Sequence, residues 1–131
     1  MKNIFKIGDV KTFEKIVDSA DLAGFEAGLV HPVYSTFSLG RDAEWVCRLF
    51  VLDMKEAHEE GIGTFLTINH ESPAMLGQKV IFEAEIIKLE GVIIDCKYTA
   101  SVRDRVIARG TQGQMILPKE RIKKLFDSVK S

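Results

Sequence analysis

Glu44, His70 and Thr36 are the residues whose types and spacing best suit acid–base or nucleophilic chemistry. Glu44 stands among apolar neighbours on the second turn of a predicted helix, so we expect it to be partly buried. Burial disfavours the charged carboxylate, while the helix N-terminus favours it by about 0.3–1 kcal/mol. Such a carboxylate stays ionised but weakly solvated, which suits a nucleophile or a general base.

Each of these residues also has a purely structural explanation. Glu44 and Arg48 stand four apart and could form an ion pair on the helix surface. His70 ends a predicted strand just before a turn, where a single histidine more often serves as a structural hydrogen-bonding group. Thr36 could be only a helix cap, and Gly63 could be only part of a turn. The residues alone therefore predict a candidate acid–base cluster and leave both explanations open.

The element that carries Glu44 is a long helix, expected from Thr36 to about Glu60. Apolar residues recur along it at intervals of three and four, and further apolar residues widen this stripe, so the helix should be covered on most sides. Ser35, Thr36 or Ser38 could cap its start. The stripe consists of Leu39, Ala43, Val46, Phe50, Met54 and Ala57, widened by Trp45, Leu49 and Leu52.

After the helix the apolar period changes to two, which indicates a meander of antiparallel strands. Glu90-Gly91 and Arg103-Asp104 are the predicted hairpin turns. The expected strands are Thr64–His70, Lys79–Leu89, Val92–Val102 and Val106–Leu117.

The two ends of the chain give weaker patterns. We expect a short strand at Thr12–Val17 and an irregular connection at Phe25–Tyr34, because Gly28 and Pro32 interrupt the latter. Pro118 should open a short C-terminal helix. The apolar seam predicted for that helix is Ile122, Leu125, Phe126 and Val129.

These elements predict an α+β protein in which one antiparallel sheet wraps around one long helix, with residues 1–131 forming a single domain. A sheet needs one face covered, and only the long helix is apolar enough to cover it. Such a sheet leaves edges exposed, and pairing with a second copy is the usual remedy. We therefore expect a homodimer or a tetramer built from dimers.

Composition narrows the range of functions. The net charge of −1 gives no bulk attraction to nucleic acid, and no apolar run has the length that spans a membrane. Cys47 and Cys96 lie within apolar patterns, which indicates buried free thiols and a reducing, cytoplasmic location. No metal site is expected, because there is no CxxC pair and no closely spaced pair of histidines.

Taken together, these residues resemble the fluoroacetyl-CoA thioesterase family, a branch of the hot-dog-fold thioesterases. Ser35-Thr36, followed by Glu44-Trp45-Val46-Cys47, is similar to the start of that family's helix. Gly63-Thr64 resembles the opening of its second strand, and His70 stands where the family has its catalytic histidine. The resemblance runs from about Leu29 to Leu117 and continues through Gly77, Glu90-Gly91 and Arg109-Gly110-Thr111.

The resemblance implies an acyl-CoA thioesterase that hydrolyses a thioester to an acid and free CoA without a cofactor. By analogy, Glu44 would be the nucleophile or the base that activates water, and Thr36 would hydrogen-bond it or the water. His70 would orient the attack and protonate the departing thiolate, and the N–H of Gly63 would help to hold the thioester carbonyl. The expected substrate-binding residues are Gly63, Ser35 and Gln114.

Two departures from the family pattern concern the substrate. Ala27 and Val30 stand where the family's characterised member has phenylalanines that gate its pocket, and Gln114 stands where it has an arginine. We therefore expect the thioesterase scaffold with a different, larger acyl group rather than fluoroacetyl selectivity. Because the pocket of hot-dog dimers lies at the subunit interface, the cluster is expected to draw on both chains.

Two other functions stay open. A non-catalytic hot-dog module that binds an acyl-CoA as a sensor or carrier would fit the loss of the family arginine at Gln114. A hot-dog hydratase or dehydratase would use histidine and carboxylate for proton transfers at carbon. The basic residues of Lys119–Lys130 could contact CoA phosphates or form a solvated helix face.

Overall fold

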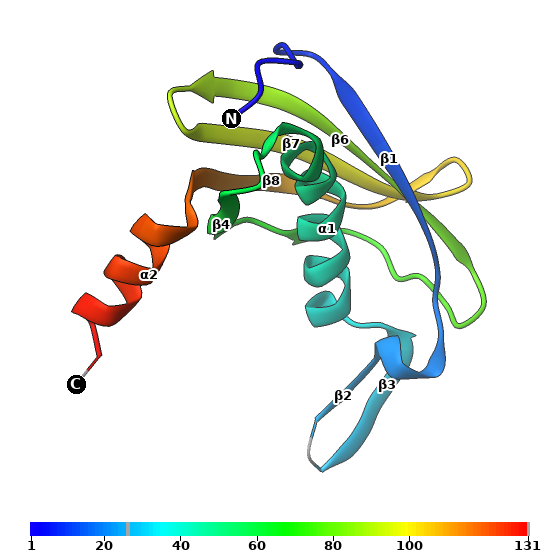
Figure 1. Ribbon diagram of the computed structural model, residues 1–131. Helices are drawn as coiled ribbons and strands as arrows, with labels where there is room; N and C mark the ends of the chain where they lie inside the picture. Colours follow the sequence, from blue (N-terminus) through cyan, green and yellow to red (C-terminus); the bar gives the residue numbers. More distant parts are fainter. Residues whose placement is uncertain (26, 131) are drawn as a thin grey trace.

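A curved antiparallel sheet wraps around one side of a single long helix, α1 (Thr36–Met54), in the computed structural model, which describes residues 1–25 and 27–130 (Figure 1). The strand order is β1-β6-β7-β8-β4, and β5 pairs with β8 beyond the end of β4. The predicted α+β arrangement is confirmed. The strands are β1 (Val10–Ile16), β4 (Glu59–Leu66), β5 (Asn69–His70), β6 (Lys79–Glu90), β7 (Ile93–Val102) and β8 (Arg105–Pro118).

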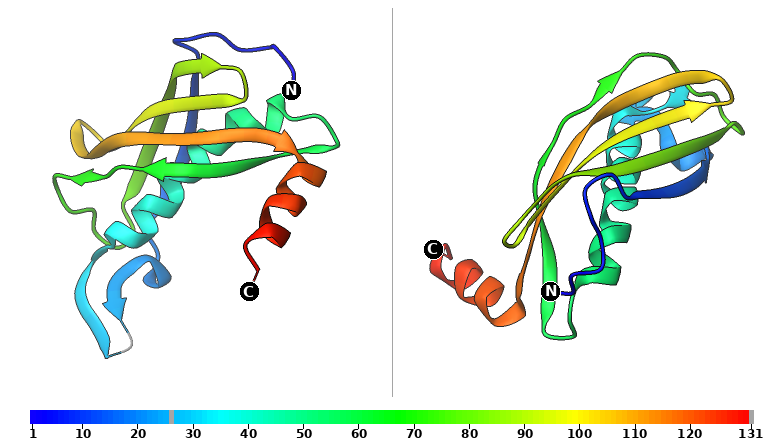
Figure 2. Two further views of the ribbon diagram at one scale, coloured as in Figure 1. Left: turned by 90° about the vertical axis from the view of Figure 1, so that its left-hand side faces the viewer. Right: turned by 90° about the horizontal axis from the view of Figure 1, so that it is seen from above.

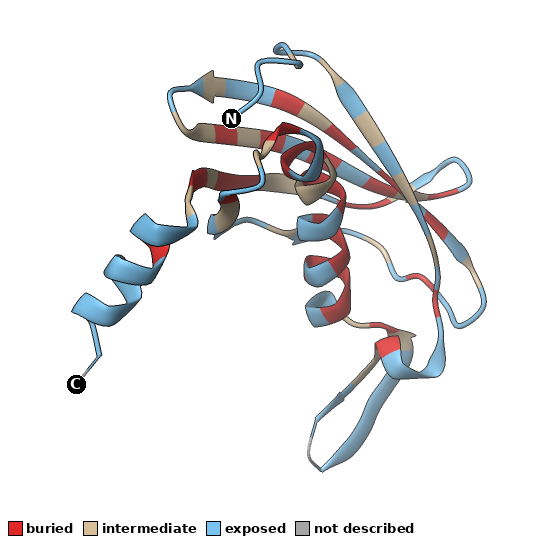
Figure 3. Cartoon of the chain, viewed as in Figure 1, coloured by how far each residue is buried: buried red, intermediate tan, exposed pale blue. Residues whose placement is uncertain are grey.

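The core lies between the concave face of the sheet and α1 (Figure 3). Along β6, Phe82 and Ile86 are fully buried, while Glu83 between them is exposed, as the period of two predicts. Phe50 of α1 is fully buried against this surface. Burial of a side chain of this size stabilises the fold by about 1.5–3 kcal/mol. Cys47 and Cys96 are both buried and free, as expected.

α1 begins at the predicted residue but ends at Met54 rather than near Glu60. Lys55 leaves the helix with extended backbone angles, φ −72° and ψ 142°. The side chain of Glu59 then accepts a hydrogen bond from the N–H of Glu56 at 2.9 Å, which closes a turn. The polar residues that follow Met54 therefore form this turn and the start of β4, so the predicted length was wrong.

The predicted strand Thr64–His70 is one part of a longer, interrupted strand. β4 already begins at Glu59, and β5 resumes the pairing with β8 after a break at residues 67–68. At the break, the hydroxyl of Thr67 accepts a hydrogen bond from the N–H of Thr111 at 2.8 Å. The carbonyl of Thr67 accepts another from the hydroxyl of Tyr98 at 2.7 Å. These bonds hold the backbone in place where the strand is interrupted. The alternation of apolar and polar residues in the sequence does not predict such an interruption.

The prediction of an irregular connection at Phe25–Tyr34 was also wrong. β2 (Leu22–Phe25) and β3 (Gly28–Tyr34) form an antiparallel hairpin that projects beyond the N-terminal end of α1 (Figure 1). A short 3-10 helix, η1 (Ser19–Asp21), precedes it. Gly28 has φ +117°, a backbone angle that favours glycine. Pro32 is tolerated because both strands of a two-stranded ribbon are edge strands, where proline is allowed. Residue 26 lies outside the described residues.

Two apolar surfaces are open, and the first of them was predicted to be covered. Trp45 and Leu52, on the side of α1 away from the sheet, are 40% and 39% exposed, because the sheet wraps around one side of the helix only. The second helix, α2 (Lys119–Ser128), extends away from the sheet (Figure 2), and of its predicted seam only Ile122 is buried. Neither described helix combines the length and apolar character of a membrane-spanning helix.

Candidate active site

The N-terminus of α1 brings Thr36 and His70 together. Ser35 is the N-cap, because its hydroxyl accepts a hydrogen bond from the N–H of Ser38 at 3.0 Å. The hydroxyl of Thr36 is therefore not needed as a cap, and its Oγ1 lies 2.8 Å from Nδ1 of His70. Pairing of His70 with Ala108 of β8 fixes the backbone from which the imidazole projects. The arrangement is a hydroxyl–imidazole pair, as found in nucleophile and proton-transfer sites.

His70 is partly enclosed by the protein. Burial lowers its pKa below the ordinary histidine value of 6.5, although a backbone hydrogen bond with Ser72 opposes this effect. Its Nε2 is the one buried side-chain nitrogen or oxygen without a hydrogen-bond partner in the part of the chain that the structure describes. The imidazole is therefore neutral at pH 7 and able to accept a proton.

This pKa predicts the acid side of the pH–rate profile. We expect kcat/KM to decline at acid pH with a midpoint below pH 6.5, because imidazolium can no longer accept the hydrogen bond of the Thr36 hydroxyl. As the pH falls, the unfolded chain binds a proton at His70 before the folded protein does, because the pKa of His70 is lower in the folded state. The free energy of unfolding should therefore also fall as the pH drops through this range. Denaturation of wild type and His70→Asn at pH 7 and about pH 5 measures the second effect, which should be smaller in the variant. A decline in kcat/KM with its midpoint above pH 6.5 would contradict the assignment.

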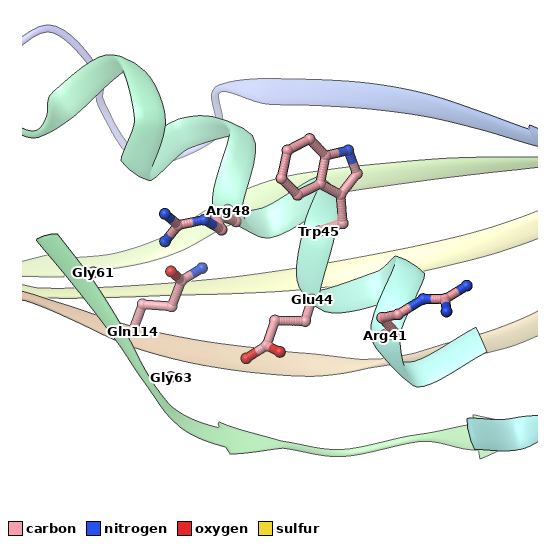
Figure 4. A pocket seen from close by; sticks show the side chains of 7 residues that line it. All are labelled: Arg41, Glu44, Trp45, Arg48, Gly61, Gly63 and Gln114. Carbon is pink, nitrogen blue, oxygen red and sulfur yellow. The ribbon is translucent and has the colours of Figure 1, made fainter. Parts of the chain in front are cut away.

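Glu44 lies further along α1, against strand β4. Its carboxylate packs on the backbone of Gly63, where an added Cβ would come within 2.5 Å of Oε1 (Figure 4). Both residues line a cavity of about 280 Å³ with Arg48 and Gln114. The Glu44–Arg48 ion pair does not form, because Arg48 pairs with Glu60 at 2.8 Å. Glu44 is exposed in the single chain rather than partly buried, which corrects the prediction.

Two buried glutamines of β8 lie behind this carboxylate. Nε2 of Gln112 is 3.3 Å from Oε1 of Glu44, and Nε2 of Gln114 donates to Oε1 of Gln112 at 3.0 Å. Gln114 was singled out from the sequence, whereas Gln112 was missed. The sequence held one indication of Gln112. Buried and outward-facing positions alternate along β8, and residues 112 and 114 are two polar side chains on its buried face.

The two groups are separate within one chain. Thr36 and Glu44 are eight residues apart on one helix, which corresponds to about 12 Å along its axis. They line one further cavity of about 380 Å³, together with Gly40 and Leu66. The structure thus brings Thr36 to His70, and Glu44 to Gly63 and the glutamines, without bringing Glu44 to His70.

The surface between the two groups is apolar and uncovered. Phe37 is 84% exposed, and Leu66 of β4, which lines the same cavity, is 38% exposed. β4 is the last strand of the sheet, and no described strand pairs with its outer edge. Within the described ranges, no three His, Cys, Asp or Glu residues are grouped so that they could hold a metal ion.

Comparison with known proteins identifies the family. The sequence profile described as fluoroacetyl-CoA-specific thioesterase matches residues 17–120, which is most of the chain. The chain belongs to this family. Its members are thioester hydrolases, and the predicted family resemblance is confirmed. No curated protein sequence matches the chain.

Solved structures agree with membership of the fluoroacetyl-CoA-specific thioesterase family. A Thermus thermophilus thioesterase superfamily member is 31% identical, with a TM-score of 0.91 over 97% of this chain and 94% of that one. The fluoroacetyl-CoA thioesterase FlK is 19% identical, with a TM-score of 0.87 over 97% and 98% of the two chains. A hot-dog-like protein from Thermanaerovibrio acidaminovorans has a TM-score of 0.86 at 17% identity over 97% and 95%. The hot-dog fold is confirmed.

Proposed function

We propose that this protein hydrolyses acyl-CoA thioesters with Glu44, Thr36 and His70, without a cofactor. The observation that carries the proposal is the arrangement of the two groups around one apolar surface. A hydroxyl–imidazole pair stands at one end, and a carboxylate free of any described ion pair stands at the other. The chain that carries both groups belongs to a thioesterase family. The structures of FlK include complexes with fluoroacetate and CoA and with acetyl-CoA.

The proposed chemistry needs one base and donors for the carbonyl oxygen. Glu44 takes a proton from water as the water oxygen adds to the thioester carbon. The C–S bond then breaks, the sulfur takes up that proton, and the products are a carboxylic acid and free CoA. The N–H of Gly63 stabilises the charge that develops on the carbonyl oxygen. Because His70 is neutral at pH 7, its role is to hold the Thr36 hydroxyl against the attacking water rather than to protonate the thiolate.

The separation of the two groups favours a site shared by two copies of the chain. Thr36 and Glu44 line one cavity, but within the chain Thr36 contacts His70 while the Glu44 carboxylate contacts Gln112 two helical turns away. A second copy that pairs along the free edge of β4 and follows a two-fold axis would bring its own Glu44 towards Thr36 and His70. The same pairing would cover Phe37 and Leu66.

The acyl group is expected to be larger than fluoroacetyl. Val30 on β3 is 54% exposed, and neither Val30 nor Ala27 carries the aromatic ring that the family's characterised member has at these places. Without bulky gating side chains, the entrance leaves room for a longer chain. The apolar lining by Phe37, Leu66 and Ile68 suits a hydrocarbon acyl group.

A panel of acyl-CoA substrates tests the proposed function. With a thiol-trapping dye as readout, the purified protein should release CoA from acyl-CoAs longer than acetyl and faster than from fluoroacetyl-CoA. Tight binding without release would indicate the sensor or carrier module. Addition of water to a crotonyl-type thioester without CoA release would indicate a hydratase. Either result would overturn the thioesterase proposal.

A further inference from the structure

Gln112 is a buried amide in direct contact with the Glu44 carboxylate. Its side chain is 1% exposed and points from β8 into the space between the sheet and α1. Nε2 lies 3.3 Å from Oε1 of Glu44 and 3.1 Å from the carbonyl of Gly113. A side chain buried to this degree must satisfy its amide within the protein.

The surrounding groups fix which way this amide points. Nε2 faces two acceptors, the Glu44 carboxylate and the Gly113 carbonyl, while Oε1 receives a hydrogen bond from Nε2 of Gln114 at 3.0 Å. A reversed amide would place its oxygen against both acceptors, which is unfavourable. The N–H group of Gln112 is therefore aimed at Glu44, and Gln114 prevents it from turning.

The contact holds one oxygen of Glu44 and leaves the other free. Oε1 is held between Gln112 and the backbone of Gly63, where no side chain stands. The glycine allows the carboxylate to approach the strand, and the amide provides its N–H donor. A base that removes a proton from water gains from this arrangement, because its geometry is set before the substrate binds.

We propose that Gln112 is a positioning residue for Glu44, with Gln114 orienting Gln112 in turn. This inference rests on the proposed role of Glu44 in thioester hydrolysis. Gln112 itself touches neither substrate nor water in this scheme; it acts through the carboxylate. Gln114 differs, since it also lines the cavity that holds Glu44.

The direct test is crystallographic and needs no enzymatic activity. In Gln112→Met, which keeps the size but removes the N–H donor, the Glu44 carboxylate should leave its place against Gly63 or occupy several conformers. Gln112→Glu should also displace this carboxylate, through like charge, and it replaces the first variant if Gln112→Met does not fold.

Tyr98→Phe is the matched control. It also removes a core hydrogen bond, from the Tyr98 hydroxyl to the Thr67 carbonyl at 2.7 Å, but it touches no atom of Glu44. In this variant the Glu44 carboxylate should lie as it does in wild type. In the kinetic assay, Gln112→Met should lower kcat roughly tenfold with KM within about twofold, and Tyr98→Phe should not show this split.

The two hypotheses fail separately. If wild type hydrolyses no acyl-CoA, the proposed function fails while the crystal structures still decide whether Gln112 holds Glu44. If wild type is active but the Glu44 carboxylate lies alike in wild type and Gln112→Met, or is displaced equally in Tyr98→Phe, Gln112 is only a buried structural amide and the inference is overturned.

Discussion

Replacing Glu44 by glutamine is expected to lower kcat for acyl-CoA hydrolysis by at least about 100-fold, with a much smaller change in KM. Glutamine keeps the size of the side chain and its contact with Gly63 but cannot take a proton from water. The measurement is CoA release under saturating substrate, with thermal unfolding to show that the variant folds. Because Glu44 is exposed and forms no ion pair among the described residues, stability should hardly change.

Glu85→Gln provides the control for this substitution. Glu85 lies on β6 and pairs with Lys97 of the neighbouring strand on the outer face of the sheet, away from Glu44 and His70. Its removal should leave kcat as in wild type. A Glu44→Gln variant that keeps the wild-type rate would remove the carboxylate from the mechanism and with it the proposed chemistry.

Mixing two inactive variants is expected to restore about a quarter of the wild-type activity. In the shared site, Glu44 of one subunit acts with Thr36 and His70 of the other. A dimer of Glu44→Gln with His70→Asn then has one intact site and one that lacks both groups. Random pairing of equal amounts makes about half of the dimers mixed, each with one of two sites working.

The same experiment excludes a site built within one chain. If Glu44 acted with His70 of its own subunit, every site in the mixed dimer would lack one group, and mixing would restore nothing. The subunits are exchanged by mild denaturation and refolding together, and each variant refolded alone serves as the baseline. The recovered activity should also grow with the time allowed for exchange, since it depends on the mixed dimer.

The strands of the sheet were the most predictable part of the fold. β6 and β7 alternate so regularly that their faces and the hairpin at Glu90-Gly91 follow from the sequence. The end of α1 did not follow, because the residues after Met54 are good helix formers and a side-chain contact of Glu59 decides the turn. The hairpin at β2 and β3 was hidden by Gly28 and Pro32, which interrupt strands in larger sheets.

The candidate site could be predicted only in part. The pairing of Thr36 with His70 was not predicted, because the family resemblance implied that Thr36 contacts Glu44 or the attacking water. The pair depends on Ser35 being the cap, and three hydroxyl residues could have filled that position. The contact of Gln112 with Glu44 spans two elements far apart in the chain. Such a contact follows from strand register and helix placement, which periodicity does not fix.

Ser35 and Thr36 have different roles at the start of α1, and this difference affects how the site can change during evolution. The hydroxyl of Ser35 caps the helix, while that of Thr36 is exposed beside the imidazole of His70. The residue at position 36 is therefore not needed to cap the helix. A mutation there can exchange one reactive group for another, such as serine or cysteine, without unravelling the first turn. Substitutions at position 36 can thus change the reactive group of the site while the fold is kept.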